Sequence, residues 1–134
     1  MPNKVNAIEW LTIAFHDLQS AKILFEANHY TDSIANDLQQ SLEKILKSIL
    51  AYENQKIKKS HELVEIYALV RNIINLDDDL ELLEKATAYY KEDRYPNPNY
   101  CLPPREEIKE IMDFTESLFL KVCDLLEIDP KGIQ

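Results

Sequence analysis

Residues 32–54 read DSIANDLQQSLEKILKSILAYEN, and this segment decides the fold. Its apolar residues recur at steps of three and four, which places them on one side of a helix. A stripe this wide covers more than one neighbouring helix. The segment therefore predicts a long helix that packs against several partners. The centre of the apolar stripe is formed by Ile34, Leu38, Leu42, Ile45, Ile49 and Tyr52. The stripe is widened by Ala35, Leu46 and Leu50.

A second helical pattern precedes this segment. Apolar residues at the same spacing run from Val5 to about Ala27. The turn between the two helices is short, so they should run antiparallel. Within that turn, the side-chain oxygen of Thr31 or Asp32 is suited to cap the second helix.

The pattern continues after residue 54 in shorter pieces. Ser60 is suited to cap a third helix, and the triplet Asp77-Asp78-Asp79 to cap a fourth segment. We expect a third arm that is broken into two helical pieces, from Ser60 to Ile74 and from Leu80 to Tyr90. A last helix should run from Pro104 to about Ile128, followed by a frayed tail over 131–134. The sum is an all-α, antiparallel up-and-down four-helix bundle with an additional short helical segment.

The length and composition agree with one helical domain. A chain of 134 residues falls within the usual size of a single domain, here 1–134 with a core at about 5–128. Gly132 is the only glycine. Because tight hairpins and phosphate-cradling loops need glycine, sheet-rich folds, a dinucleotide-binding fingerprint and a P-loop are all disfavoured.

Charge and cysteine content limit the partners. A net charge of −9 argues against general nucleic-acid binding, which needs positive surface. No stretch approaches the length of an apolar membrane span, so we expect a cytoplasmic protein with no membrane partner. Cys101 and Cys123 lack the paired spacing of a zinc site and are expected as reduced thiols. Glu26 and His29 share a helix face but have no matching second pair, so we expect no metal and no cofactor.

Function is expected near residues 89–104, YYKEDRYPNPNYCLPP, where aromatic residues, an arginine and four prolines interrupt the helical pattern. Arg94 stands beside Tyr95 in a part of the chain stiffened by Pro96 and Pro98, so it would lose little entropy on binding a ligand. An arginine suits bidentate contact with phosphate. The alternative is that Arg94 pairs with an acidic residue of its own chain.

A small basic patch is the second functional candidate. We predict a nucleotide-binding site from cations and one aromatic residue: Lys44, Lys47, Lys59, His61, Arg94 and Tyr95. The alternative for the lysines is a solvated rim. For His61, at the start of a helix where the dipole disfavours its protonated form, the alternative is a structural hydrogen bond.

Several sequence motifs follow one another along the chain in an order that is typical of one protein family. The order begins with Ala14-x-x-Asp17-Leu18-x-x-Ala21 and continues with Gln39, Glu43-Lys44 and Lys47. It closes with His61-Glu62-Leu63 and Arg94-Tyr95-Pro96. The chain resembles the HEPN family, small helical domains of higher eukaryotes and prokaryotes named for presumed nucleotide binding. The resemblance, to the small stand-alone prokaryotic type, implies a helical bundle that forms a homodimer.

The same resemblance bears on activity. In the family's ribonuclease branch, an arginine is followed after four to six residues by a histidine. Here the arginine is Arg94, and the histidine position falls on Asn99, Tyr100 or Cys101, none of which titrates as imidazole does. The chain is therefore expected to be a non-catalytic module that binds a nucleotide such as ATP or GTP, or pairs with a minimal nucleotidyltransferase in a two-component, toxin–antitoxin-like system. The alternatives are a metal-independent ribonuclease toxin acting on RNA and a ligand-free interaction scaffold.

Overall fold

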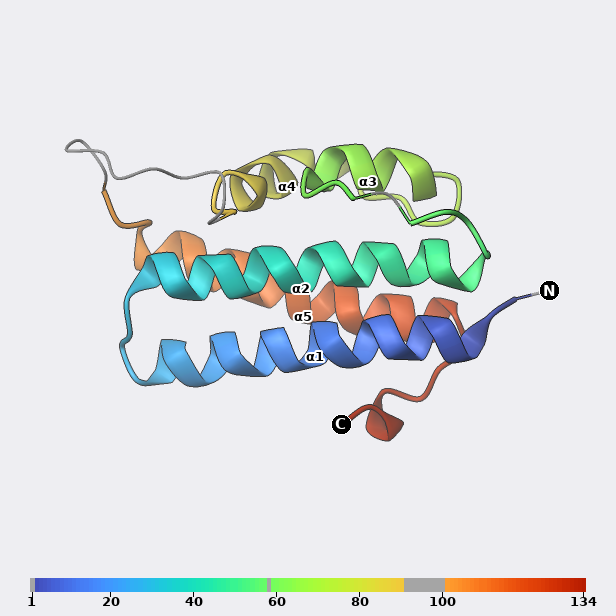
Figure 1. Ribbon diagram of the computed structural model, residues 1–134. Coiled ribbons are helices and arrows are strands. Elements are labelled where there is room, and N and C mark those ends of the chain that lie inside the picture. The colour runs from blue at the N-terminus through green and yellow to red at the C-terminus, as the bar shows by residue number, and fades with distance from the viewer. Residues whose placement is uncertain (1, 58, 91–100) are drawn as a thin grey trace.

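The computed structural model describes residues 2–57, 59–90 and 101–134 (Figure 1). These residues form five α-helices and two 3-10 helices and contain no strand, which confirms the all-α prediction. None of their helices combines the length and the apolar character needed to cross a bilayer. The elements are α1 (Lys4–Glu26), α2 (Thr31–Tyr52), α3 (Leu63–Val70), η1 (Asp77–Asp79), α4 (Leu80–Thr87), α5 (Arg105–Leu125) and η3 (Pro130–Gly132).

Helix α2 is the centre of the bundle. It packs against α1 and α5 on one side and against α3 and α4 on the other (Figure 1). Fourteen of its 22 residues are buried, which is possible only for a helix with partners around most of its circumference. The wide apolar stripe of residues 32–54 therefore predicted the role of this helix correctly.

Helices α1 and α2 pack closely because small residues line their contact. The buried residues of α1 alternate alanine and leucine at steps of four and three, the spacing of a coiled-coil seam: Ala7, Leu11, Ala14, Leu18 and Ala21. An alanine lets the backbone of the partner approach. At this contact the Ser41 hydroxyl donates a 2.7 Å hydrogen bond to the Ala14 carbonyl oxygen, which joins the two helices directly.

The third arm consists of two helical pieces, as predicted. Helices α3 and α4 fold back on each other, and both pack along α2 (Figure 1). The backbone N–H of Leu63, which opens α3, donates to the hydroxyl of Thr87, which ends α4. At the other end, the buried Tyr67 hydroxyl donates to Asp77 and accepts from the N–H of Leu76, both at 2.7 Å. These bonds close the turn and bring the start of α3 to the end of α4.

The predicted caps of α2 and α3 are wrong, whereas Asp79 of the acidic triplet does stand at the N-cap position of α4, without a side-chain cap bond. The residue that caps α2 is Tyr30, and its side chain makes no cap bond. The Ser60 hydroxyl accepts the N–H of Glu62 and so closes a turn ahead of α3 rather than capping the helix. Short polar side chains serve turns as readily as helix starts, because both offer an unpaired N–H nearby.

The C-terminal residues are not a frayed tail. The Asp129 carboxylate accepts the backbone N–H of Lys131 and starts the 3-10 helix η3. Ile133 follows with only 4% of its surface exposed and belongs to the core. Burial of this isoleucine, which the polar neighbours in the sequence obscured, holds the segment against the bundle.

The three long helices share one ending. Asn28, Asn54 and Glu127 follow them in the left-handed conformation, each with φ of 56°. The next residue then donates its N–H to a carbonyl five residues back, as in a Schellman motif. The three bonds run from His29 to Leu24, Gln55 to Leu50 and Ile128 to Cys123. The chain ends these helices without the glycine that commonly serves there.

Candidate functional site

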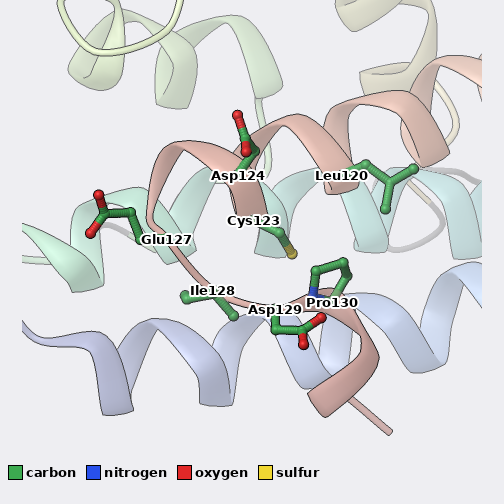
Figure 2. A pocket seen from close by; sticks show the side chains of 7 residues that line it. All are labelled: Leu120, Cys123, Asp124, Glu127, Ile128, Asp129 and Pro130. Atoms are coloured by element: carbon green, nitrogen blue, oxygen red, sulfur yellow. The ribbon is translucent and has the colours of Figure 1, made fainter.

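A hollow of about 510 Å³ lies where α5 meets the C-terminal residues (Figure 2). Burial, with the Asp129 carboxylate nearby, raises the pKa of the Cys123 thiol to about 11. The thiol therefore stays protonated near neutral pH and is a poor nucleophile. Lys44, Lys47, Lys59 and His61, the predicted site residues that the structure describes, do not line this hollow, whose walls are Leu120, Cys123, Asp124, Glu127, Ile128, Asp129 and Pro130.

The predicted site residues lie elsewhere, on α2 and on the segment that leads into α3. The structure places Lys44 and Lys47 on α2 and Lys59 and His61 before α3. Arg94 and Tyr95 lie outside the described residues.

An ion pair inside the bundle is the base of the site. Lys47 and Glu43 stand one helical turn apart on α2, so their side chains share a face. The ammonium of Lys47 lies 2.9 Å from Oε2 of Glu43, and each residue is only 5% exposed. The Trp10 ring of α1 lies 6.0 Å from the same ammonium.

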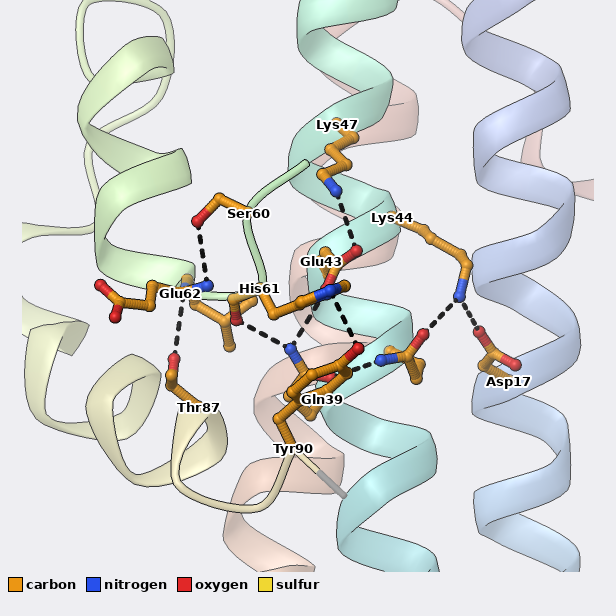
Figure 3. Close-up of polar contacts among 12 residues, drawn as sticks. Asp17, Gln39, Glu43, Lys44, Lys47, Ser60, His61, Glu62, Thr87 and Tyr90 are labelled. Carbon is orange, nitrogen blue, oxygen red and sulfur yellow. Dashed lines mark hydrogen bonds and ion pairs between the residues drawn. The ribbon is translucent and has the colours of Figure 1, made fainter. Parts of the chain in front are cut away.

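His61 joins this pair from the segment before α3. Its Nδ1 lies 2.8 Å from Oε1 of Glu43 (Figure 3). The fully buried Gln39 amide donates to the His61 carbonyl oxygen at 3.0 Å, and a longer contact of 3.3 Å reaches Oε1 of Glu43. The imidazole is thus fixed to α2 through both its ring and its backbone.

The Glu43 carboxyl is held in its charged form. Burial alone would raise the pKa of Glu43, but hydrogen bonds from Lys47 and His61 outweigh burial and lower it below its usual value. An ionised carboxylate can only accept hydrogen bonds, so Nδ1 of His61 must carry a proton. Nε2 is then the ring nitrogen that faces the Tyr90 hydroxyl.

Tyr90 closes the site from the end of α4. Its ring stacks on the His61 imidazole, with centroids 3.9 Å apart and an angle of 19° between the rings. The Tyr90 hydroxyl lies 2.9 Å from Nε2. Because the rings are nearly parallel, the hydroxyl approaches Nε2 from over the face of the imidazole, and stacking is the main contact between the two side chains. Tyr90 is 5% exposed, whereas 40% of the His61 side chain is exposed.

The two α2 lysines point to different partners. Lys47 reaches Glu43, while Lys44 extends toward α1 and pairs with Asp17 at 3.0 Å (Figure 3). Lys59 is exposed, two residues before His61. The structure therefore brings Lys47 and His61 together through Glu43 and turns Lys44 toward α1.

Comparison with known proteins identifies the family. The family model described as HEPN domain matches residues 7–126. The chain belongs to the HEPN domain family. The comparison with curated proteins found no match.

Two solved structures share this HEPN fold. One is TT1696 from Thermus thermophilus, with a TM-score of 0.75 and 24% identity over 90% of this chain and 98% of that one. The other is ST0689, described as an archaeal HEPN homologue, with a TM-score of 0.69 and 20% identity over the same shares. The family model confirms the predicted family, and these two structures confirm the helical fold.

Polar residues that carry the HEPN resemblance are paired with each other in this domain. Asp17 meets Lys44, and Glu43 meets both Lys47 and His61. Spacing alone does not reveal this, because the partners come from three different elements.

Gln39, Glu43 and Tyr90 also belong to the site, although the sequence did not predict a role there for them. A signal for the first two was present, since Gln39, Glu43 and Lys47 follow at steps of four within the apolar face of α2. Polar residues at buried positions require partners, and three in register predict a network. Tyr90 gave no such signal, because its contact with His61 depends on the α3–α4 hairpin.

The other histidines of this HEPN domain lie outside the network. His16 is exposed, and its Nε2 contacts the Gln134 carbonyl oxygen at 3.1 Å. His29 is exposed and meets the edge of the Tyr30 ring. Among the described residues, no three histidine, cysteine or acidic side chains gather closely enough to hold a metal ion.

Proposed function

We propose that this HEPN domain is a non-catalytic module that binds a nucleotide at a surface centred on His61. The single observation that carries the proposal is the partly exposed His61 imidazole, held on its inner side by the buried pair of Glu43 and Lys47.

The energetics of the buried pair support a binding role. Removing two charges from water costs several kcal/mol per ion, and apolar residues of the same volume often stabilise a fold as well or better. Stability alone therefore gives little reason for a charged pair at this place. The pair does fix the orientation of the imidazole, and a side chain already fixed loses little entropy when a ligand binds.

Charge near His61 supports a phosphate-bearing ligand. Lys56 and Lys59 are both exposed in the segment that precedes His61. In a chain with a net charge of −9, local cations offer a phosphate group a place that the rest of the surface does not. Arg94, from the sequence, is the bidentate phosphate contact of this proposal.

The assembly belongs to the same proposal. We infer a homodimer, in which the exposed apolar residues Val5, Ile13 and Ile23 of α1 are candidates for the contact. A minimal nucleotidyltransferase is the proposed protein partner, as the two-component systems of this family imply. Sedimentation equilibrium at two protein concentrations tests the dimer, and a monomer at both contradicts it.

Thermal unfolding with ATP and with GTP tests the ligand. At a free concentration 100 times the dissociation constant, a ligand stabilises the fold by about 2.7 kcal/mol. For a domain of this size, that raises Tm by several degrees. Fluorescence of Trp10, the only tryptophan, gives a second measurement because its ring lies near Lys47.

Two variants and a control sharpen this test. Arg94→Ala and His61→Ala should each remove the rise in Tm. Lys109→Ala removes an exposed cation of α5 that pairs with Asp113, and should leave the rise unchanged. No rise with either nucleotide would remove the ligand from the proposal and leave an interaction scaffold.

The Glu43–His61 contact favours one second candidate, metal-independent RNA cleavage. A carboxylate on Nδ1 orients an imidazole for proton transfer at Nε2, so His61 can stand in for the histidine that the family's motif lacks after Arg94. Purified protein would then degrade RNA in the presence of a chelator, and Arg94→Ala and His61→Ala would abolish the activity. Cleavage that survives both substitutions comes from a contaminating nuclease.

A further inference from the structure

We propose that the His61 ring is a stacking platform for the base of the ligand, on the face opposite Tyr90. This inference rests on the nucleotide-binding function proposed above and names the part of the nucleotide that is recognised. It predicts that the ligand carries a planar heteroaromatic ring and that a phosphate compound without such a ring does not bind to His61.

Among the described residues, the ring that stacks on His61 is that of Tyr90, which leaves the second face of the imidazole for a ligand. Tyr90 covers the other face, with ring centroids 3.9 Å apart. Nδ1 is bonded to Glu43, and Nε2 faces the Tyr90 hydroxyl. The His61 side chain is 40% exposed, and we assign part of this exposure to the face turned away from Tyr90.

The ring is also held still. Glu43 fixes one edge of the imidazole, Tyr90 fixes one face, and Gln39 holds the backbone carbonyl of the same residue. A flat surface that is already immobile suits stacking, because binding does not have to freeze a side chain. A base placed on it continues the stack that His61 and Tyr90 begin.

The lysines that precede His61 indicate where the phosphates of the bound nucleotide should lie. Lys56 and Lys59 are exposed in the segment leading to His61. Lys59 and Lys56 stand two and five residues before His61, and we assign these exposed ammonium groups to the phosphates. The arrangement predicts that nucleosides bind weakly, nucleotides bind better, and inorganic polyphosphate gains nothing from the ring.

Calorimetric titration of the full chain tests the proposal with ATP, adenosine and tripolyphosphate. The dissociation constant for ATP should rise about tenfold or more in His61→Leu, as expected from the strength of base–aromatic stacking, and by a smaller factor in His61→Phe, which keeps a ring but loses the bond to Glu43. His29→Leu changes an exposed histidine outside the network and should bind like the wild type.

A measurement on the wild type guards against variants that fail to fold. The imidazole Cε1–H resonances of the three histidines are assigned by substitution and followed by NMR. Adenosine should move the His61 resonance upfield through the ring current of the base, and tripolyphosphate should not.

The outcomes separate this proposal from the nucleotide-binding function. Equal affinity of His61→Leu and wild type for ATP, or an unmoved His61 resonance when ATP is bound, overturns the stacking and leaves nucleotide binding in place. Tripolyphosphate bound as tightly as ATP also overturns it. An absence of ATP binding overturns both.

Discussion

Glu43 shows how a single residue can be both buried and charged. Its carboxylate lies inside the bundle and accepts from Lys47 on one oxygen and from His61 on the other. Hydrogen bonds to ionised groups are roughly twice as strong as neutral ones, and here they outweigh the effect of burial. The position therefore depends on its partners rather than on its own polarity.

Glu43 makes the free energy of unfolding depend on pH. The pKa of Glu43 is lower in the folded state than its ordinary value of 4.5, so its contribution to stability is complete above that pH. The contribution is lost as the pH falls through 4.5 toward the folded pKa. At pH 7, Glu43→Gln leaves Lys47 buried without its counter-charge and should lower the free energy of unfolding by about 3 to 5 kcal/mol.

Urea denaturation at pH 7 and again below pH 4 measures this effect. The difference between wild type and Glu43→Gln should shrink at the lower pH. Glu65→Gln changes an exposed glutamate of α3 and should show little difference at either pH. A Glu43→Gln difference that stays constant would mean that the carboxylate is not the charged partner of Lys47.

At the scale of elements, the helix ends limit stability. Glu127 takes the left-handed conformation after α5, with φ of 56°. That conformation costs most residues about 1 to 2 kcal/mol, and glycine adopts it freely. Asn28 holds the same conformation after α1, and asparagine tolerates it better than glutamate does.

Glu127→Gly should therefore stabilise the protein. The expected gain is about 0.5 to 1 kcal/mol, since the added freedom of glycine in the unfolded chain offsets part of the relief. The bond from Lys4 goes to the backbone oxygen of Glu127 and is retained. Asn28→Gly is the matched comparison with a smaller expected gain. Denaturation midpoints measure both, and a loss of stability in Glu127→Gly would contradict the strain argument.

The elements themselves were largely predictable, because helical periodicity is local. The spacing of apolar residues placed α1, α2 and α5 within a few residues of their observed bounds. The α3–α4 hairpin was not predicted, since a helix that continues and one that turns back have the same apolar pattern. The turn is decided by Tyr67, whose bonds to Leu76 and Asp77 cannot be read from spacing.

At the scale of the whole molecule, the candidate site is a product of the fold. Lys47 and His61 were chosen from the sequence as cations and are joined in the structure by Glu43. Lys44 was chosen for the same reason and serves the contact with α1. Side chains on one helix face diverge according to what packs beside them, and only the assembled bundle decides that. The roles of these residues in nucleotide binding remain predictions.

The central claim is that the charged pair on α2 serves to hold His61 for a ligand. The double variant Glu43→Leu/Lys47→Met tests it, because it replaces both charges with apolar side chains of similar size. Such replacements of buried ion pairs are often neutral or stabilising, so the fold should be at least as stable as the wild type. With His61 no longer held by a carboxylate, calorimetric titration should show ATP binding lost or weakened about tenfold or more. A stable double variant that binds ATP as tightly as the wild type would contradict the account.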